Sequence, residues 1–281
     1  MNKVAIVGTG LIGASFGLAL RKAGFTGEII GVSSERAIAD AKAAGAIDRD
    51  STLAEAAGAA DLIFLSQTIG RIVDTLRHLD PLVKPGALVT DAGSTKCEIV
   101  DAALQHLTRC EFLGGHPMAG KERRGASEAS ASLFESQLWV LTPVESSALE
   151  TSAAREFRGW LTRIGARVAV LDCEAHDGIV ALTSHLPQLA STALAATLDA
   201  RLREGQSDVA GSGLKDMTRL AQSSYDLWRD ILATNAERID TALAAYIQEL
   251  EHIRENLRTR ELQDEFTRAA AFASRVRRDP R

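Results

Sequence analysis

The sequence predicts an α/β protein in which a domain built around a parallel β-sheet is followed by an all-α domain. Over the first 172 residues, short apolar runs alternate with helical patterns, which is typical of parallel strands joined by helical crossovers. A glycine-rich turn joins the first of these runs to the first helical pattern. Beyond Asp172, strand-like runs vanish and alanine-rich helical periodicity takes over. We therefore expect two domains, at residues 1–172 and 173–281.

The glycine-rich turn has the spacing G-x-G-x-x-G. It directly follows the apolar run Val4–Val7 and opens a helix whose apolar residues recur through Leu20. In such a turn the first glycine allows the tight bend, the second lets the backbone approach a pyrophosphate, and the third lets the helix pack closely on the strand. The N–H groups at the helix start are unpaired and favour phosphate. This position favours a Rossmann-type dinucleotide site over a plain structural turn, with the cofactor at Gly8, Gly10, Leu11, Ile12 and Gly13.

The end of the second predicted strand, Glu28–Val32, bears on the choice of cofactor. An NAD site normally has an Asp or Glu about 20 residues past the glycine motif, where it holds the ribose 2′-hydroxyl. Here Ser33, Ser34 and Arg36 occupy that place. Two hydroxyls and a guanidinium can bind a 2′-phosphate, which a carboxylate would repel. The serines can also cap the helix that begins near Glu35, and the two roles are compatible. We predict NADP in preference to NAD.

The remaining elements of the predicted sheet domain follow in alternation. The predicted strands are 62–65, 87–90, 112–114, 138–141 and 167–171, and the predicted helices are 36–44, 69–79, 96–107 and 147–163. Pro81, Pro85 and Pro143 fall in predicted loops or at strand edges, so none of them contradicts these assignments.

The predicted helical domain contains two long helices. The first, Ala175–Leu202, is interrupted near Pro187, and the second spans Tyr225–Leu257, with the polar segment Gly205–Gly213 connecting them. The second helix carries an apolar stripe formed by Leu227, Ile231, Ile239, Leu243, Tyr246, Leu250 and Ile253. Such a stripe is too long to be covered within one small domain, so it predicts pairing with a second copy in a homodimer.

Composition and charge disfavour several classes of protein. The formal net charge of −5 argues against nucleic acid as a partner, because phosphate needs a basic face, and the arginines of 275–281 are interpreted as a frayed end. No apolar stretch approaches the ~20 residues that span a membrane, and a first strand beginning at Lys3 leaves no room for a signal peptide. We therefore expect a cytoplasmic protein. No metal site is expected, because the cysteines lack metal-ligand spacing and read as buried free thiols: Cys97, Cys110 and Cys173.

Polar groups that a simple fold would not require follow two of the predicted strands. The segment Asp91–Lys96 follows the fourth strand and Gly114–Glu122 follows the fifth, so both lie at the carboxyl edge of the sheet, where ligands bind in this fold class. His116 lies between glycines and a proline, which favours a catalytic base over a core histidine. Ser94 and its neighbour Thr95 are equally well explained as helix caps.

Two polar segments of the helical domain are weaker signals. Thr183–Gln188 lies in the first long helix, and Lys215–Ala221 precedes the second. Caps and surface salt bridges explain both segments, although the guanidinium of Arg219 suits a carboxylate ligand.

Five segments, taken in order, resemble the prephenate and arogenate dehydrogenases of tyrosine biosynthesis over almost the whole chain. They read GTGLIGASFGLAL, DAGSTK, GGHPMAGKERRGASEASASLF, SHLPQLAS and KDMTRLAQSSYDLWRDILATN, of which HPMAG and SHLP are specific to that family. The resemblance implies a Rossmann domain followed by a helical dimerisation domain. It also implies an oxidative decarboxylation, in which hydride leaves ring C4 for the nicotinamide, carbon dioxide leaves C1 and the ring becomes aromatic.

The resemblance implies roles for five residues that match the family's motifs. His116 corresponds to the neutral histidine that hydrogen-bonds the C4 hydroxyl and takes its proton, and Ser94 to the serine that orients that histidine. Arg219 corresponds to the arginine that binds a substrate carboxylate, and Glu122 to an acid that pairs with this arginine and gates the pocket. Trp228 corresponds to a tryptophan that lines the site from the neighbouring subunit, although a core position in the helix stripe explains it equally well.

The chain departs from the family at two places. Prephenate-specific members often have a second histidine one turn after His185, where this chain has Gln188. A glutamine can offer its carbonyl oxygen to the ammonium group of arogenate, so the resemblance leaves both substrates open. Gln67 and Thr68, which the resemblance places at the cofactor, lack the proline expected at that turn, so the backbone geometry there is expected to differ.

Two other classes of protein are compatible with the fold. One is a non-catalytic sensor that binds a dinucleotide, and the other is a different two-domain dehydrogenase acting on hydroxyacids or imines. A sensor has no need of a base beside a carboxylate clamp, so the presence of His116, Ser94 and Arg219 argues against it. The HPMAG segment discriminates against the second class.

Overall fold

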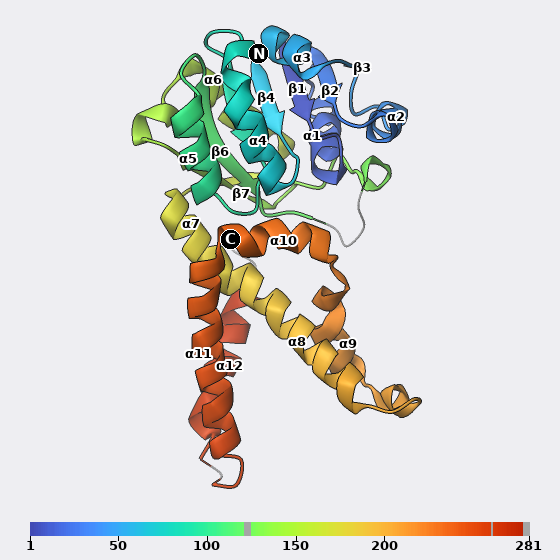
Figure 1. Cartoon of the computed structure of the whole chain (residues 1–281), viewed down its shortest axis with the longest axis vertical. Helices are drawn as coiled ribbons and strands as arrows, with labels where there is room; N and C mark the ends of the chain where they lie inside the picture. Colours follow the sequence, from blue (N-terminus) through green and yellow to red (C-terminus); the bar gives the residue numbers. More distant parts are fainter. Residues whose placement is uncertain (121–124, 260, 278–281) are drawn as a thin grey trace. The chain divides into compact units, whose positions relative to one another are not determined.

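The computed structural model describes residues 1–120, 125–259 and 261–277 (Figure 1). The chain divides into two compact units, Met1–Ala236 and Glu237–Arg281. The first unit holds the whole sheet and the helices as far as α10, and the second holds most of α11 together with α12.

An eight-stranded sheet with the strand order β3-β2-β1-β4-β5-β6-β7-β8 forms the centre of the first unit. Within the described residues, neighbouring strands are parallel except β6 and β7, which are antiparallel. Residues Val4–Val7 of β1 pair with β2 on one side and with β4 on the other. The strands are β1 Lys3–Val7, β2 Glu28–Val32, β3 Arg49–Asp50, β4 Leu62–Leu65, β5 Leu88–Asp91, β6 Glu111–Pro117, β7 Leu138–Pro143 and β8 Arg167–Val170.

Helices cover both faces of the sheet. Successive strand residues point to opposite faces, and β1 shows this directly: Val4 and Ile6 belong to one buried apolar cluster, and Ala5 and Val7 to another. The first cluster includes side chains of α1 (Leu11–Lys22), α2 (Glu35–Ala43) and α6 (Ser152–Ile164). The second includes side chains of α3 (Leu53–Ala59), α4 (Ile69–Leu79) and α5 (Cys97–His106), and Figure 1 shows α4 and α5 side by side against the sheet. Both faces of β1 are therefore buried, as expected of a parallel sheet with helical crossovers.

The predicted α/β domain is confirmed, with two differences of detail. The strand β7 runs antiparallel to β6, so the sheet is not parallel throughout. The elements β3 and α3 escaped prediction because β3 has two residues and α3 is a seven-residue helix of mostly alanine, without an apolar period.

The first long helix beyond the sheet is interrupted, as predicted from Pro187. It consists of α7 (Cys173–Val180), a wider turn with π-helical hydrogen bonding over Ala181–His185, and α8 (Leu186–Arg201). Proline has no N–H to donate to a carbonyl of the preceding turn, which explains the interruption. Single π-helical turns within α-helices are frequent at functional sites. The short helices α9 (Ser212–Thr218) and α10 (Tyr225–Thr234) complete the unit.

The prediction of one continuous helix over Tyr225–Leu257 was wrong. The chain leaves helical geometry at Asn235, whose φ is −129°, and separates α10 from α11 (Ala236–Glu255). The side chain of Asn235 is 1% exposed and makes hydrogen bonds inside the first unit. An amide that finds buried partners outside the helix explains a break that periodicity alone could not reveal.

In the second unit, α11 and α12 (Gln263–Val276) are joined by a hydrogen bond between His252 Nε2 and Glu265 Oε1, 3.1 Å apart. The prediction of a frayed end was wrong for Arg275, which lies in the last turn of α12. Arg278 and Arg281 lie outside the described residues.

The helical run Cys173–Arg201 contradicts one further expectation. By length and composition alone it is long and apolar enough to cross a membrane, whereas no such stretch was predicted. A core helix of a globular unit passes the same test. This run buries the polar residues His176, Asp177, His185 and Gln188, and Asp177 accepts two hydrogen bonds from the start of α5. The described contacts of these polar residues lie within the first unit, although only 28% of the run's apolar stretch is buried.

Candidate active site

The glycine turn has the geometry that a dinucleotide requires. Gly8 has φ of +99°, which only glycine adopts freely, and a Cβ there would lie 2.8 Å from the Ser66 backbone. A Cβ on Gly13 would lie 2.1 Å from the Gly8 carbonyl oxygen, so the helix can pack on the turn only without a side chain. A Cβ on Gly10 would meet nothing within 4 Å. The open side of the turn is thus at Gly10, where the predicted pyrophosphate would approach.

The start of α1 supplies the electrostatics for an anion. Gly10 is the N-cap residue and offers no side chain to the first turn, and that turn carries no acidic residue. The N–H groups of Leu11 and Ile12 lie in this first turn, where a helix has no internal acceptors for them. The partial positive charge and free donors fit the pyrophosphate of a nicotinamide dinucleotide.

The residues predicted to choose between NADP and NAD lie on the surface at the end of β2. Ser33, Ser34 and Arg36 are exposed, and Ser34 is the N-cap residue of α2 although its side chain makes no capping hydrogen bond. Glu35 is exposed in the same turn and opposes an extra phosphate. Across the carboxyl edge, Thr68 is the exposed N-cap residue of α4.

The side chain of Gln67 is turned towards α4. Its Oε1 accepts a hydrogen bond of 2.9 Å from Thr75 Oγ1. The side-chain carbonyl is thus already paired with the helix, and only the rest of Gln67 is available to a cofactor.

A buried ion pair fixes the backbone beside His116. Lys96 and Asp91 are both fully buried and are in contact through Nζ and Oδ2. Lys96 Nζ also donates to the Gly115 carbonyl at 2.7 Å, and the Gly115 N–H donates to Asp91 Oδ1 at 3.0 Å. Both backbone groups of Gly115 are therefore held by the end of β5 and the start of α5. Burial lowers the pKa of Lys96, and the Asp91 carboxylate opposes that change.

His116 lies at the carboxyl end of β6, half-buried, and is the first member of a chain of hydrogen bonds. Its Nδ1 lies 2.8 Å from Nε2 of His176, whose Nδ1 lies 2.7 Å from Oδ1 of Asp177. Burial, the neighbouring His176 ring and the Lys96 ammonium hold the pKa of His116 well below its usual value of 6.5. His116 is therefore neutral at pH 7, as the predicted role of a base requires.

Asp177 connects α7 to the start of α5. Its Oδ1 accepts from the Lys96 N–H at 2.7 Å, and its Oδ2 from the Cys97 N–H at 2.9 Å. These two groups are unpaired N–H groups of the start of α5, so a carboxylate from α7 completes that helix end. Burial alone would raise the pKa of Asp177, but hydrogen bonds from His176 and these N–H groups lower it.

His185 and Trp228 lie together on the other side of Asp177. Nδ1 of His185 is 3.3 Å from Nδ2 of Asn235, which also donates to the Asp177 carbonyl at 2.9 Å. The Trp228 ring meets the His185 ring edge-on at 5.7 Å between centroids, and its buried Nε1 has no hydrogen-bond partner among the described residues. Burial lowers the pKa of His185 to about 4. Trp228 therefore lies next to predicted site residues of its own chain.

Gln188 holds the segment that carries Arg219. Its Nε2 donates to the Leu220 carbonyl at 2.8 Å, and Ser191 Oγ accepts from the Ala221 N–H at 3.1 Å. A carbonyl only accepts, so this contact fixes the amide orientation with Oε1 on the other side. Arg219 itself is exposed at the start of a short 3₁₀ helix, Arg219–Gln222.

For two of the predicted site residues, Ser94 and Glu122, the described residues show no hydrogen bond to the other members of the site. Ser94 is half-buried after β5, and among the described residues no hydrogen bond joins it to His116, whose Nδ1 is taken by His176. Glu122 lies outside the described residues.

The structure adds residues to this site that sequence reasoning did not assign. Asp91 and Lys96 belong to the polar segment predicted to lie at the carboxyl edge, but nothing in the sequence indicates that the two side chains pair across the end of β5. His176 and Asp177 are adjacent near the start of a helix. A His-Asp pair in a largely apolar helix is the sequence feature that could have indicated their role in the site. Asn235 was hidden inside a periodic apolar pattern.

None of the three cysteines forms a disulfide, and all three are half-buried, close to the prediction of buried thiols. Cys97, Cys173 and Glu174 place possible ligand atoms within 4.8 Å of one another. Burial and the nearby Asp177 raise the pKa of Cys97, and burial raises that of Cys173. Packing of α7 on α5 brings these groups together, which the spacing of the cysteines in the sequence did not indicate.

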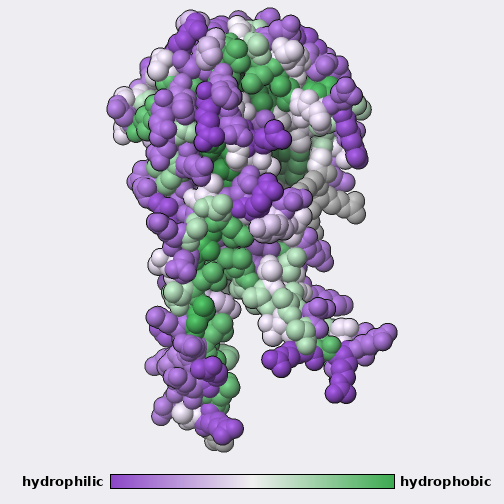
Figure 2. Space-filling view, viewed as in Figure 1, coloured by the Kyte–Doolittle hydropathy of each residue, from purple (hydrophilic) through white to green (hydrophobic). Residues whose placement is uncertain are grey.

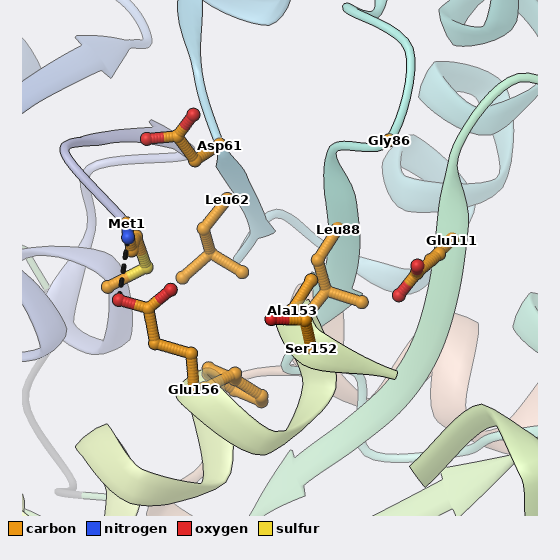
Figure 3. A pocket seen from close by; sticks show the side chains of 10 residues that line it. Met1, Asp61, Leu62, Gly86, Leu88, Glu111, Ser152, Ala153 and Glu156 are labelled. Carbon is orange, nitrogen blue, oxygen red and sulfur yellow. Dashed lines mark hydrogen bonds and ion pairs between the residues drawn. The ribbon is translucent and has the colours of Figure 1, made fainter. Parts of the chain in front are cut away.

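A separate cavity of about 270 Å³ lies at the opposite edge of the sheet (Figure 3). Leu62, Leu88 and Glu111, the first residues of β4, β5 and β6, line it, together with Glu156, which pairs with the amino group of Met1 at 2.6 Å. Ligands of this fold class bind at the carboxyl ends of the strands. This cavity is therefore not part of the candidate site.

The fold and the site together define a class of protein: a dehydrogenase with a nicotinamide dinucleotide domain and a neutral histidine at the carboxyl edge of its sheet. Residues 16–170 match the family model for the nucleotide-binding domain of prephenate dehydrogenase, and residues 172–271 match that for its dimerisation domain. The chain belongs to the prephenate dehydrogenase family, the enzymes of oxidative decarboxylation in tyrosine biosynthesis. It is an enzyme of this type, and it uses NAD(P).

Similar proteins agree with this assignment. The chain is 35% identical to a prephenate dehydrogenase of Lactococcus lactis over 84% of its own length and 66% of that protein's length. It is 34% identical to one of Bacillus subtilis over 90% of its length and 69% of that protein's length. A crystal structure of the Aquifex aeolicus prephenate dehydrogenase with hydroxyphenyl propionate and NAD⁺ superposes with a TM-score of 0.86, at 30% identity, over 99% of this chain and 97% of that one.

Further structures fall into two groups. The arogenate dehydrogenase of Synechocystis has a TM-score of 0.80 at 30% identity, over 98% of both chains. A 3-hydroxyisobutyrate dehydrogenase of Salmonella typhimurium has a TM-score of 0.58 at 17% identity, over 88% of both chains. The second likeness shows the fold alone, which the hydroxyacid alternative shares with this chain.

Proposed function

We propose that this chain catalyses the NAD(P)-dependent oxidative decarboxylation of prephenate, arogenate or both, with His116 as the base. The observation that carries the proposal is the placement of a neutral histidine at the carboxyl edge of the sheet. One ring nitrogen of His116 is hydrogen-bonded within the protein, and the other has no partner among the described residues. A neutral imidazole nitrogen is the acceptor that the C4 hydroxyl of either substrate requires.

The reaction balances in atoms and electrons. The cofactor, when bound, accepts the hydride from C4 with both electrons of the C–H bond. His116 takes the hydroxyl proton as the carbonyl forms. The bond from C1 to its carboxylate then breaks, carbon dioxide leaves, and its electron pair makes the ring aromatic. The C4 oxygen, now phenolate, recovers a proton, so no net proton is consumed.

The other predicted residues support this chemistry. Arg219 is proposed to bind a substrate carboxylate, with Glu122 as its pairing acid. Ser94 was expected to orient the histidine, but Nδ1 of His116 is bonded to His176, so Ser94 is proposed only to line the site. The site is proposed to be completed by His185 and Trp228. In its own chain Trp228 packs against His185, so the indole can line the site without a contribution from a partner subunit.

The first test is turnover itself. Purified protein with prephenate or arogenate and either cofactor should increase absorbance at 340 nm and release carbon dioxide in equal amount. One steady-state comparison of both substrates with both cofactors measures the four values of kcat/KM. Folded protein that binds the cofactor but turns over neither substrate would leave the dinucleotide-binding sensor as the better reading.

We propose arogenate as an accepted substrate. The Nε2 of Gln188 is committed to the Leu220 carbonyl, so Oε1 is the group that this side chain can still offer. An amide oxygen accepts a hydrogen bond from the ammonium group of arogenate, whereas the keto group of prephenate has no proton to donate to it.

We also propose that NADP is preferred over NAD. The expected preference is roughly tenfold in kcat/KM, which corresponds to a free-energy difference of about 1.4 kcal/mol. Ser33 and Ser34 are exposed at the end of β2, and no carboxylate occupies the strand end. Exposed ion pairs are worth only about 1 kcal/mol, and Glu35 opposes the phosphate, so the preference is moderate.

Replacing Ser33 by Asp should reverse this preference, because a carboxylate repels the 2′-phosphate and accepts from the ribose 2′-hydroxyl. The measurement is the ratio of kcat/KM for the two cofactors. Ser33→Ala is the matched control, since it removes the hydroxyl without adding charge and should change the ratio only slightly. A wild-type ratio in favour of NAD, or a ratio that Ser33→Asp leaves unchanged, would contradict the proposal.

We propose a cytoplasmic homodimer that pairs through residues 173–281. The matched family model is that of a dimerisation domain. Figure 2 shows apolar surface along the helices, and several large apolar side chains are more than two-fifths exposed in the single chain: Ile179, Leu182, Leu227, Ile247, Leu250, Phe266 and Phe272. A second copy would cover such side chains.

A further inference from the structure

We propose that Asp177 and His176 are positioning residues that fix the tautomer of His116, so that its Nε2 carries the lone pair that acts as the base. The proposal rests on the proposed function for the role of His116 and extends it to two residues of another helix. Neither of them has a role implied by the resemblance. Both are at most 1% exposed, so they act inside the protein and not on solvent.

Asp177 sets the first tautomer. Its carboxylate accepts the N–H groups of Lys96 and Cys97 at 2.7 and 2.9 Å, which fix its orientation. It lies 2.7 Å from Nδ1 of His176. A carboxylate has only lone pairs at this contact, so Nδ1 of His176 must carry the proton.

His176 passes this choice on to His116. A neutral imidazole with a proton on Nδ1 has its lone pair on Nε2. That Nε2 lies 2.8 Å from Nδ1 of His116, so His116 donates from Nδ1. The lone pair of His116 is then on Nε2, the nitrogen that has no partner among the described residues. In the opposite tautomer Nε2 would carry a proton and could not accept the proton of the substrate hydroxyl.

The charges around the two rings agree with neutral imidazoles. Lys96 faces the pair from the start of α5, but its ammonium is already bonded to Asp91 and to the Gly115 carbonyl. His185 faces it from the turn before α8 and is bonded to Asn235. Asp177 is in direct contact with the His176 ring, and its charge is shared among His176 and two backbone N–H groups.

Three variants test the proposal by kinetics. His176→Phe removes the acceptor for Nδ1 of His116 and should lower kcat by roughly 100-fold, with cofactor affinity unchanged, as expected when an orienting partner of a histidine is lost. His176→Gln keeps an oxygen acceptor near the position of Nε2 and should retain activity within about tenfold of wild type. His78→Gln, an exposed histidine on α4, is the control and should be fully active.

A double-variant comparison separates positioning from structural support. If His176 acts through His116, then adding His176→Phe to a His116→Asn protein should cause no further loss of kcat. A further loss of similar size to that in the wild-type background would show that His176 supports the fold and not the base, and would overturn the proposal.

The tautomer can be observed without turnover. In protein labelled with ¹⁵N-histidine, proton–nitrogen correlation spectra should show His116 protonated on Nδ1 and bare on Nε2, and Asp177→Asn should mix the two tautomers. A proton on Nε2 of His116 in the wild-type protein would overturn the proposal even if the enzyme is active. Conversely, if neither substrate is turned over, the proposed function fails while these spectra still decide the tautomer.

Discussion

Replacing His116 by Asn is expected to lower kcat by roughly 100-fold to 10,000-fold, the usual contribution of a positioned base. Asparagine keeps a polar group near the position of Nδ1 but offers no nitrogen lone pair to the C4 hydroxyl. The binding of the cofactor should be nearly unchanged, because the dinucleotide turn is formed by Gly8, Gly10 and Gly13 on another strand end. The measurements are kcat at saturating substrate and the dissociation constant of the cofactor.

The control for this variant is His78→Asn, which makes the same change on the exposed face of α4 and should behave as wild type. An unchanged kcat in folded His116→Asn would exclude His116 as the base. Loss of cofactor binding together with activity would point to a disturbed sheet edge instead, which circular dichroism and cofactor titration would reveal.

Replacing Arg219 by Ala is expected to weaken the binding of substrate and not the chemical step. A charge-assisted, bidentate contact to a carboxylate is worth on the order of 2 to 4 kcal/mol, or roughly 30-fold to 900-fold in affinity when it is equally strong before and during the chemistry. KM should therefore rise by about this factor, with kcat little changed. Arg219→Lys should lie between the two, because an ammonium keeps the charge without the fork of donors.

Arg201→Ala is the matched control for Arg219, since it removes an exposed guanidinium from the last turn of α8. The proposed clamp requires that this control keep the KM of the wild type. A normal KM in Arg219→Ala would move the carboxylate clamp to another residue.

The fold was predictable where each element carried its own pattern. The strands β1, β2 and β4 are continuous apolar runs, and Gly8 and Gly13 each have a local steric reason to be glycine, so spacing alone identified the nucleotide turn. The antiparallel direction of β7 was not predictable, because an apolar run does not encode the direction of its partner.

The site was predictable in part. His116 and Arg219 stood out because their neighbours in the sequence were unusual, and the resemblance supplied roles for them. Asp177 could not be linked to the start of α5 from sequence, since about 80 residues separate them and only the packing of α7 on α5 brings them together. Asn235 was misassigned to a helix because its neighbours continue the apolar period on either side of it.

The contact of Asp177 with the start of α5 determines where this chain can be divided. The change of composition after Asp172 suggests a nucleotide-binding module that could be excised and fused to other proteins. A cut there would remove the carboxylate from the N–H groups of Lys96 and Cys97, and a buried donor left unpaired costs about 1–3 kcal/mol. It would also strip the partner from His116. A module that keeps these contacts must therefore extend past α7, and the compact unit that contains them ends at Ala236, beyond helices that composition alone assigns to the other domain.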